Sequence, residues 1–298
     1  MTAADILTAP QYGFLRAVFL LAAMASVTLG LVGTFVVARR IGYLAGAISH
    51  CAFGGVGFGL WLQQTVAAGG LISSLFAFAG SDPFERSAWI DPVATAVIVA
   101  VISALLLGVL QKFAQEREDA LIGILWSLGM AIGLLFLNRT TGYVSVTGWL
   151  FGDITLVSTA DLWTVGILGG AVCLTTLAFF QRLEAVCFDA EFARLRGLAV
   201  DFYDRLLLVL VAVTVVLMIR IVGMVLVIAM LTLPATTASR LTGRLGPMIA
   251  LSIFFCFAGS WLGILLAVAL DFSAGPMIIA VESAFYFLVL PFTRRART

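Results

Sequence analysis

Nine apolar stretches follow one another along the chain, separated by short polar segments. An α-helix of about 20 apolar residues spans the roughly 30 Å hydrocarbon core of a bilayer. The pattern therefore predicts an all-α, polytopic membrane helix bundle with about eight or nine transmembrane segments. The predicted spans are residues 14–38, 41–63, 92–110, 120–137, 160–180, 205–219, 221–239, 246–269 and 276–292.

Three places in this pattern need an interpretation of their own. Residues 71–79 (LISSLFAFA) are too short to cross and are expected on the surface or in a cap. Residues 148–154 (GWLFGDI) are expected to dip into the membrane without crossing it. The stretches 205–219 and 221–239 are nearly continuous, and they are kept as two spans because merging them would scramble the distribution of charge between the two sides.

The composition is that of a membrane protein, with 62% hydrophobic and 11% charged residues. Soluble domains carry about 25% charged residues. No soluble domain of useful size is left between the spans, so a single transmembrane domain is expected over residues 1–298. The net charge of +1 gives no reason to expect a nucleic-acid partner.

The basic residues predict the orientation, because Lys and Arg collect on the cytoplasmic side of membrane proteins. Thirteen of the 17 basic residues fall on one side of the predicted spans. Only Arg16, Arg86, Arg139 and Arg220 fall on the other. This bias predicts a multi-pass plasma (inner) membrane protein with its N-terminus outside and its C-terminus in the cytoplasm.

Two ionisable residues lie well inside the predicted spans, His50 and Glu282. Such residues are rare in membranes and often functional. His50 is the only histidine and lies with Gly42, Gly46 and Gly54 at four-residue spacing, on one helix face. It is either a ligand for a divalent transition metal or a packing histidine bonded to a carbonyl. Glu282 is either protonated, bonded across helices, or in a water-filled pathway.

A third feature inside the spans is the segment MLTLPATTASR, residues 230–240. Pro234 cannot donate a hydrogen bond to the carbonyl of Met230, so a kink or break is expected. The hydroxyl of Thr232, with those of Thr236 and Thr237, could satisfy freed backbone groups. Either this is an ordinary proline kink, or Pro234 and Thr232 belong to a hinge or to the lining of a pathway.

Residues 181–204 form a polar segment between two predicted spans. Their apolar residues follow helical spacing with charges between them, which predicts an amphipathic cytoplasmic helix that is interrupted or ends at Gly197. Such a helix either lies on the membrane surface or docks a soluble partner.

Some motifs are absent from the sequence. There is no GxxxxGK[ST] loop, so the chain is not expected to bind ATP in that manner. None of the four cysteines lies in a CxxC or zinc-ribbon spacing, and no permanently bound cofactor is expected.

Five segments, in order, resemble the membrane permease of ABC-type importers of zinc, manganese or iron. They are VVARRIGYLAGAISHCAFGGVGFG, EDALIGILWSLGMAIGLL, GWLFGDI, the long segment from DAEFARLRGLAV to LTLPATTASRL, and SAGPMIIAVESAFYF. The resemblance covers most of the chain. It implies a homodimeric or paired permease that is not itself an enzyme. Its partners would be a cytoplasmic ATPase, which binds the ATP, and an extracytoplasmic metal-binding protein.

The resemblance also implies roles for particular residues. His50 falls on the histidine of the family's GDALSH motif, part of a metal path, whereas the family's acidic residue aligns with Gly46 here. Cys51 or Glu282 would then complete the site, or the metal would pass with weak contacts only. Residues 181–204 would be the cytoplasmic segment that couples the permease to the ATPase, which we call the coupling segment, with Glu191, Ala193 and Gly197 at the ATPase interface.

The function expected on these grounds is ATP-driven import of a divalent transition-metal ion, with ATP hydrolysed by a partner chain. The alternative is a secondary transporter of a metal or small cation, for which Glu282 is the one candidate coupling carboxylate inside the spans. An intramembrane enzyme would need more catalytic groups at depth, and a structural scaffold would tolerate changes at both His50 and Glu282.

Overall fold

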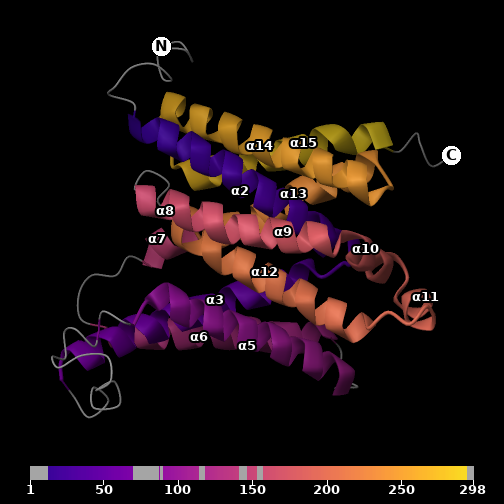
Figure 1. Ribbon diagram of the computed structural model, residues 1–298. Coiled ribbons are helices and arrows are strands. Elements are labelled where there is room, and N and C mark those ends of the chain that lie inside the picture. The colour runs from indigo at the N-terminus through magenta and orange to yellow at the C-terminus, as the bar shows by residue number, and fades with distance from the viewer. Residues whose placement is uncertain are drawn as a thin grey trace. The chain divides into compact units, whose positions relative to one another are not determined.

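The computed structural model describes residues 13–69, 87, 90–113, 118–140, 146–152 and 157–293, and the statements below concern these residues. The predicted segment 71–79 lies outside them. The described secondary structure is helical throughout (Figure 1). The helices are α2 (Gly13–Ala38), α3 (Gly42–Ala67), α5 (Pro92–Phe113), α6 (Glu118–Leu137), α7 (Val146–Phe151), α8 (Thr159–Thr164), the π-helix η4 (Val165–Gly169), α9 (Gly170–Ala178), α10 (Phe180–Phe188), α11 (Ala190–Leu195), α12 (Val200–Val222), α13 (Met224–Leu241), α14 (Leu245–Leu270) and α15 (Ala274–Thr293).

The prediction of an all-α bundle of about eight or nine spans is confirmed. Within the described ranges, nine helical segments are long and apolar enough to cross a membrane. Each coincides with one of the nine predicted stretches, with ends shifted by a few residues. The helix α7 is only 6 residues long and is not among the nine, as expected for a segment that does not cross.

The helices group into two compact units. The first contains residues 1–42 and 147–298, and the second contains residues 43–146. Both units are built from predicted spans, and the single domain over residues 1–298 stays a prediction.

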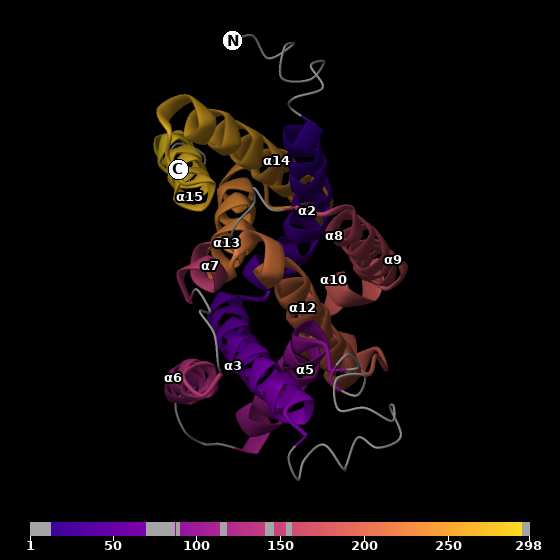
Figure 2. The same ribbon diagram turned by 90° about the vertical axis from the view of Figure 1, so that its left-hand side faces the viewer.

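In the first unit, α2, α13, α14 and α15 pack closely together, as both views of the molecule show (Figures 1 and 2). Close approach is possible because α2 presents glycines to the backbones of its neighbours. A Cβ on Gly33 of α2 would collide with the backbone carbonyl of Leu231 in α13. A Cβ on Gly30 would come within 2.8 Å of the backbone of Ile253 in α14. Van der Waals packing of this kind holds helices together where water is absent.

The nearly continuous pair α12 and α13 is interrupted by one residue, Gly223, with φ +85° and ψ 156°. A positive φ is readily accessible only to glycine. Gly152, just after α7, also has a positive φ, and a Cβ there would collide with the carbonyl group of Val222. The two glycines therefore allow the end of α7 to pack against the interruption between α12 and α13. The prediction that 205–219 and 221–239 are two separate spans is confirmed.

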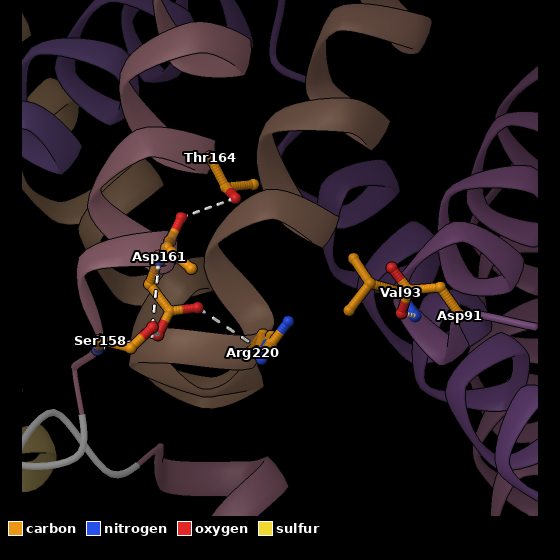
Figure 3. Close-up of polar contacts among 7 residues, drawn as sticks. Asp91, Val93, Ser158, Asp161, Thr164 and Arg220 are labelled. Carbon is orange, nitrogen blue, oxygen red and sulfur yellow. Dashed lines mark hydrogen bonds and ion pairs between the residues drawn. The ribbon is translucent and has the colours of Figure 1, made fainter. Parts of the chain in front are cut away.

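One end of α12 is tied to α8 by polar contacts (Figure 3). The side chain of Ser158 accepts a hydrogen bond from the backbone N–H of Asp161, and the Asp161 carboxylate accepts one from the backbone N–H of Ser158. This reciprocal capping box satisfies backbone donors at the start of α8. The Asp161 carboxylate also lies 3.8 Å from Nε of Arg220 in α12.

In the second unit, α3 lies between α5 and α6, and its glycines form two contact surfaces. Gly54 and Gly57 face the backbone of α6 at Gly129 and Gly133. On the other side, Gly55 lies against α5, where the Thr95 hydroxyl donates to its carbonyl at 3.1 Å. The small residues that made this span unusual in the sequence therefore bring three helix backbones into contact.

Candidate transport site and coupling surface

His50 lies on α3 and is half-buried. Its imidazole stacks on the indole of Trp126 from α6, with ring centroids 4.5 Å apart and an angle of 30° between the planes. Its Nδ1 is buried and has no hydrogen-bond partner among the described residues. The carbonyl bond that would define a packing histidine is therefore missing at this nitrogen, although buried polar atoms are usually paired.

The backbones of α3 and α6 meet beside this ring. A Cβ on Gly129 would come within 2.6 Å of the Cys51 nitrogen and 2.7 Å of the His50 carbonyl carbon. The Cys51 thiol donates to the carbonyl of Leu125 at 3.4 Å. The thiol of Cys51 thus takes part in the contact between α3 and α6, whereas metal binding would require its thiolate.

Glu282 lies on α15 and is only 2% exposed. Its side chain packs against Gly259 of α14, where a Cβ would come within 2.6 Å of its Cγ. Neither carboxyl oxygen has a hydrogen-bond partner among the described residues. Glu282 belongs to the first unit and His50 to the second, so the structure does not test a site shared by the two.

Pro234 lies inside α13, which continues through it as one helix. The hydroxyls of Thr232, Thr236 and Thr237 donate to the carbonyls four residues before them, and none of these is Met230. The Met230 carbonyl that proline leaves free instead lies 4.0 Å from the thiol of Cys256 on α14. A break is not observed, because a neighbouring helix supplies a donor.

The coupling segment forms α10, α11 and the start of α12, packed on the end of α2. Nine buried residues make the core of this region: Leu31, Phe35, Leu183, Val186, Ala193, Val200, Tyr203, Leu207 and Leu245. Ala193 is 1% exposed inside this core, so it seats α11 and does not form a surface. Glu191 and Gly197 are exposed.

Large apolar side chains of the coupling segment point outward. Leu195 is 87% exposed, and Phe188, Phe192 and Phe202 are also exposed. The guanidinium of Arg196 lies over the ring of Phe192, 4.8 Å from its centroid. An exposed apolar patch with a basic residue is typical of a surface that contacts another protein or the membrane surface.

Gly197 ends α11 with φ +80°. Its N–H donates to the carbonyl of Arg194, and the N–H of Leu198 donates to the carbonyl of Ala193. These two bonds form a Schellman motif, in which glycine is the preferred residue at the left-handed position.

We expect Gly197→Pro to change the direction in which the chain leaves α11, because proline fixes φ near −65° and lacks the N–H. The resemblance implies that an ATPase docks on the coupling segment, and a loss of about 1.4 kcal/mol in the free energy of that docking would reduce the affinity for the ATPase about tenfold. The measurement is ATP hydrolysis linked to transport in the assembled complex. Gly197→Asn is the control and should retain most activity, since Asn tolerates this conformation. If Gly197→Pro and Gly197→Asn hydrolyse ATP equally well during transport, the left-handed turn at residue 197 is not needed for docking.

Arg39 at the end of α2 joins three elements. Its Nη2 lies 2.9 and 3.1 Å from the two carboxylate oxygens of Asp204 in α12, and its Nη1 donates to the carbonyl of Val186 in α10 at 3.1 Å. The next residue, Arg40, has φ +61° and closes α2 before α3 begins at Gly42. Burial raises the pKa of the neighbouring Cys187 thiol to about 11, so that this thiol stays neutral beside the ion pair at physiological pH.

We expect Arg39→Ala to destabilise the protein by about 1–2 kcal/mol, because a charge-assisted, partly buried hydrogen-bond network is lost. The measurement is the thermal unfolding temperature of the purified protein. The matched control is Arg194→Ala, since the Arg194–Asp201 pair is longer, at 3.5 Å, and more exposed. That variant should cost less than about 0.5 kcal/mol. Equal shifts in the two variants would refute the special role of Arg39.

The sequence analysis missed Trp126 and the Arg39–Asp204 pair. A signal for Trp126 exists, because it shares a helix face with Gly129 and Gly133, the residues of closest approach. No signal links Arg39 to Asp204, since 165 residues separate them. In the part of the chain that the structure describes, no three His, Cys, Asp or Glu residues are grouped so as to hold a metal ion.

The fold and the spans define a multi-pass helical membrane protein. Residues 11–293 match the ABC 3 transport family, and the chain belongs to this family. It is 35% identical over 261 residues to a Chlamydia pneumoniae protein named "Probable metal transport system membrane protein", covering 87% of this chain and 82% of that protein. It is 29% identical to the manganese transport system membrane protein of Halalkalibacterium halodurans, covering 95% and 88%.

A solved structure gives the same family likeness. PsaBC from Streptococcus pneumoniae, in complex with a Fab, matches with a TM-score of 0.80 and 26% sequence identity. The match covers 97% of this chain and 95% of that chain. The resemblance inferred from the five sequence segments is therefore confirmed.

Proposed function

We propose that this chain is the membrane-spanning subunit of an ATP-driven importer of a divalent transition-metal ion, zinc, manganese or iron. It lies in the plasma (inner) membrane with its N-terminus outside and works as a pair of copies. Membership in the ABC 3 transport family and the metal-transport names of its relatives support this function. The observation that carries it is His50, a half-buried imidazole on a membrane span whose Nδ1 has no hydrogen-bond partner in the described residues.

The proposed route of the metal runs past His50, with the ion received from an extracytoplasmic binding protein. A neutral imidazole binds borderline metals such as Zn²⁺ reversibly. A site with few ligands suits transport, because an ion that is held too tightly is released slowly. Cys51, Glu282, Pro234 and Thr232 stay candidates for the rest of the pathway, and the carboxyl oxygens of Glu282 have no hydrogen-bond partner among the described residues.

In this proposal the energy for transport comes from ATP hydrolysis by a cytoplasmic ATPase. This ATPase docks on the exposed apolar side chains of the coupling segment. Phe188, Phe192 and Leu195 would form this contact, with Glu191 and Gly197 beside them. The core that contains Ala193 would transmit movement from α11 to α2 and α12. This movement would open the His50 site alternately to the two sides of the membrane.

The test is uptake of Zn²⁺ and Mn²⁺ into proteoliposomes that contain the chain together with its ATPase. Uptake that requires ATP hydrolysis supports the proposal. Uptake that continues without the ATPase, driven by an ion gradient, would instead support a secondary transporter, and the absence of any metal uptake by an ATP-hydrolysing complex would refute both.

A further inference from the structure

The indole of Trp126 covers two positions of α3 at once. It stacks on His50, and it also occupies the space into which a side chain at position 46 would project, where an added Cβ would collide with its six-membered ring. Positions 46 and 50 are four residues apart and share one helix face. In this arrangement the indole of Trp126 fills the space that a side chain at position 46 would need, and glycine leaves that space open.

This arrangement limits the ligands that the surface between α3 and α6 can offer. Position 46 is one turn from His50, the place from which a second ligand could join the imidazole on a shared ion. An indole has an N–H donor and no acceptor, so Trp126 cannot take that place as a metal ligand. The neighbouring Cys51 thiol donates to the carbonyl of Leu125. Among these groups, the imidazole is the only metal ligand left available.

We propose that Trp126, seated over Gly46, is a specificity-determining residue that makes the His50 site a nitrogen site and favours Zn²⁺ over Mn²⁺. The inference rests on the proposed function. Imidazole suits zinc, whereas Mn²⁺ binds more weakly at a given site and prefers carboxylate and carbonyl oxygen. By excluding an oxygen ligand from position 46, Trp126 withholds the group that would improve manganese binding.

The first test is a double-mutant cycle at positions 46 and 126, measured as ATP-dependent uptake of Zn²⁺ and Mn²⁺ by the reconstituted complex. Gly46→Asp alone should reduce uptake of both metals by at least about tenfold, because its side chain and the indole compete for one space. Trp126→Ala combined with Gly46→Asp should restore uptake and raise the Mn²⁺-to-Zn²⁺ ratio by about tenfold over the wild type.

The outcomes separate the inference from the function on which it rests. If the wild type shows His50-dependent uptake but Gly46→Asp behaves the same with and without Trp126, the inference is wrong and the function stands. The same holds if the double variant assembles and transports with an unchanged metal ratio. If the wild type shows no metal uptake that depends on His50, the proposed function itself fails.

A second measurement does not depend on how well the double variant folds. Co²⁺ quenches the fluorescence of an indole that lies close to it, so Co²⁺ bound at His50 should quench Trp126. We expect a saturable quenching component in the wild-type complex that disappears in Trp126→Phe and in His50→Ala. Trp126→Phe keeps an aromatic ring against His50 and should assemble normally. A quenching component that survives in Trp126→Phe would overturn the placement of the ion beside this indole.

Discussion

Replacing His50 by alanine is expected to reduce metal uptake by more than about 100-fold, since even residues that only support a metal ligand cost 10–100-fold when removed. The physical reason is the desolvation of the ion. A divalent cation crossing an apolar barrier loses its water, and a site in the membrane must replace part of that hydration. His50 is the only imidazole in the chain.

The structure supplies a control for this prediction. Ser252 on α14 is fully buried, and its hydroxyl oxygen, like Nδ1 of His50, has no hydrogen-bond partner among the described residues. If loss of any buried polar group were enough to stop transport, Ser252→Ala would stop it too. We expect Ser252→Ala to retain metal uptake within about twofold, because most small changes away from a functional site have small effects. Assembly with the ATPase should be unaffected in both variants. Normal uptake by a well-assembled His50→Ala complex would remove this residue from the pathway.

The second large effect is expected for Leu195→Asp in the coupling segment. Leu195 is 87% exposed, so the change should leave the folded protein intact. In contact with the ATPase, however, a carboxylate would be trapped in an apolar interface without a partner, which costs about 3 kcal/mol or more. Uptake and metal-stimulated ATP hydrolysis should both fall about 100-fold.

Two variants make this prediction specific. Leu195→Met keeps the apolar contact and should retain activity. Leu241→Asp places the same charge on another exposed leucine, at the end of α13 and outside the coupling segment. It should have little effect. If Leu195→Asp binds the ATPase and transports like the wild type, the docking surface lies elsewhere.

The spans were predictable because a bilayer imposes one rule on all of them. About 20 apolar residues in a row must form a helix there, since no other arrangement satisfies the backbone within a single segment. The distribution of charge between the two sides separated α12 from α13, and Gly223 with its positive φ is the residue that makes the separation. The presence of His50 and Glu282 inside spans was equally visible, because charge stands out against an apolar background.

Contacts between distant helices were not predictable in this way. The free carbonyl of Met230 was expected to be served by local hydroxyls, but the nearest donor is the thiol of Cys256 on another helix. Ala193 was implied at a partner interface and is buried in a core instead. Both depend on which faces of the helices meet, and one sequence does not specify which residues far apart along the chain become neighbours.

The central claim, that position 50 lies on the transport pathway, is tested most directly by accessibility. The measurement uses His50→Cys in a background in which Cys51, Cys173, Cys187 and Cys256 are replaced by serine or alanine. A membrane-impermeant thiol reagent is added from one side or the other, with and without nucleotide and Zn²⁺. If transport passes position 50, the thiol is labelled from opposite sides in the nucleotide-free and ATP-bound states and is protected by Zn²⁺. A thiol at position 50 that reacts from neither side in either state would contradict it.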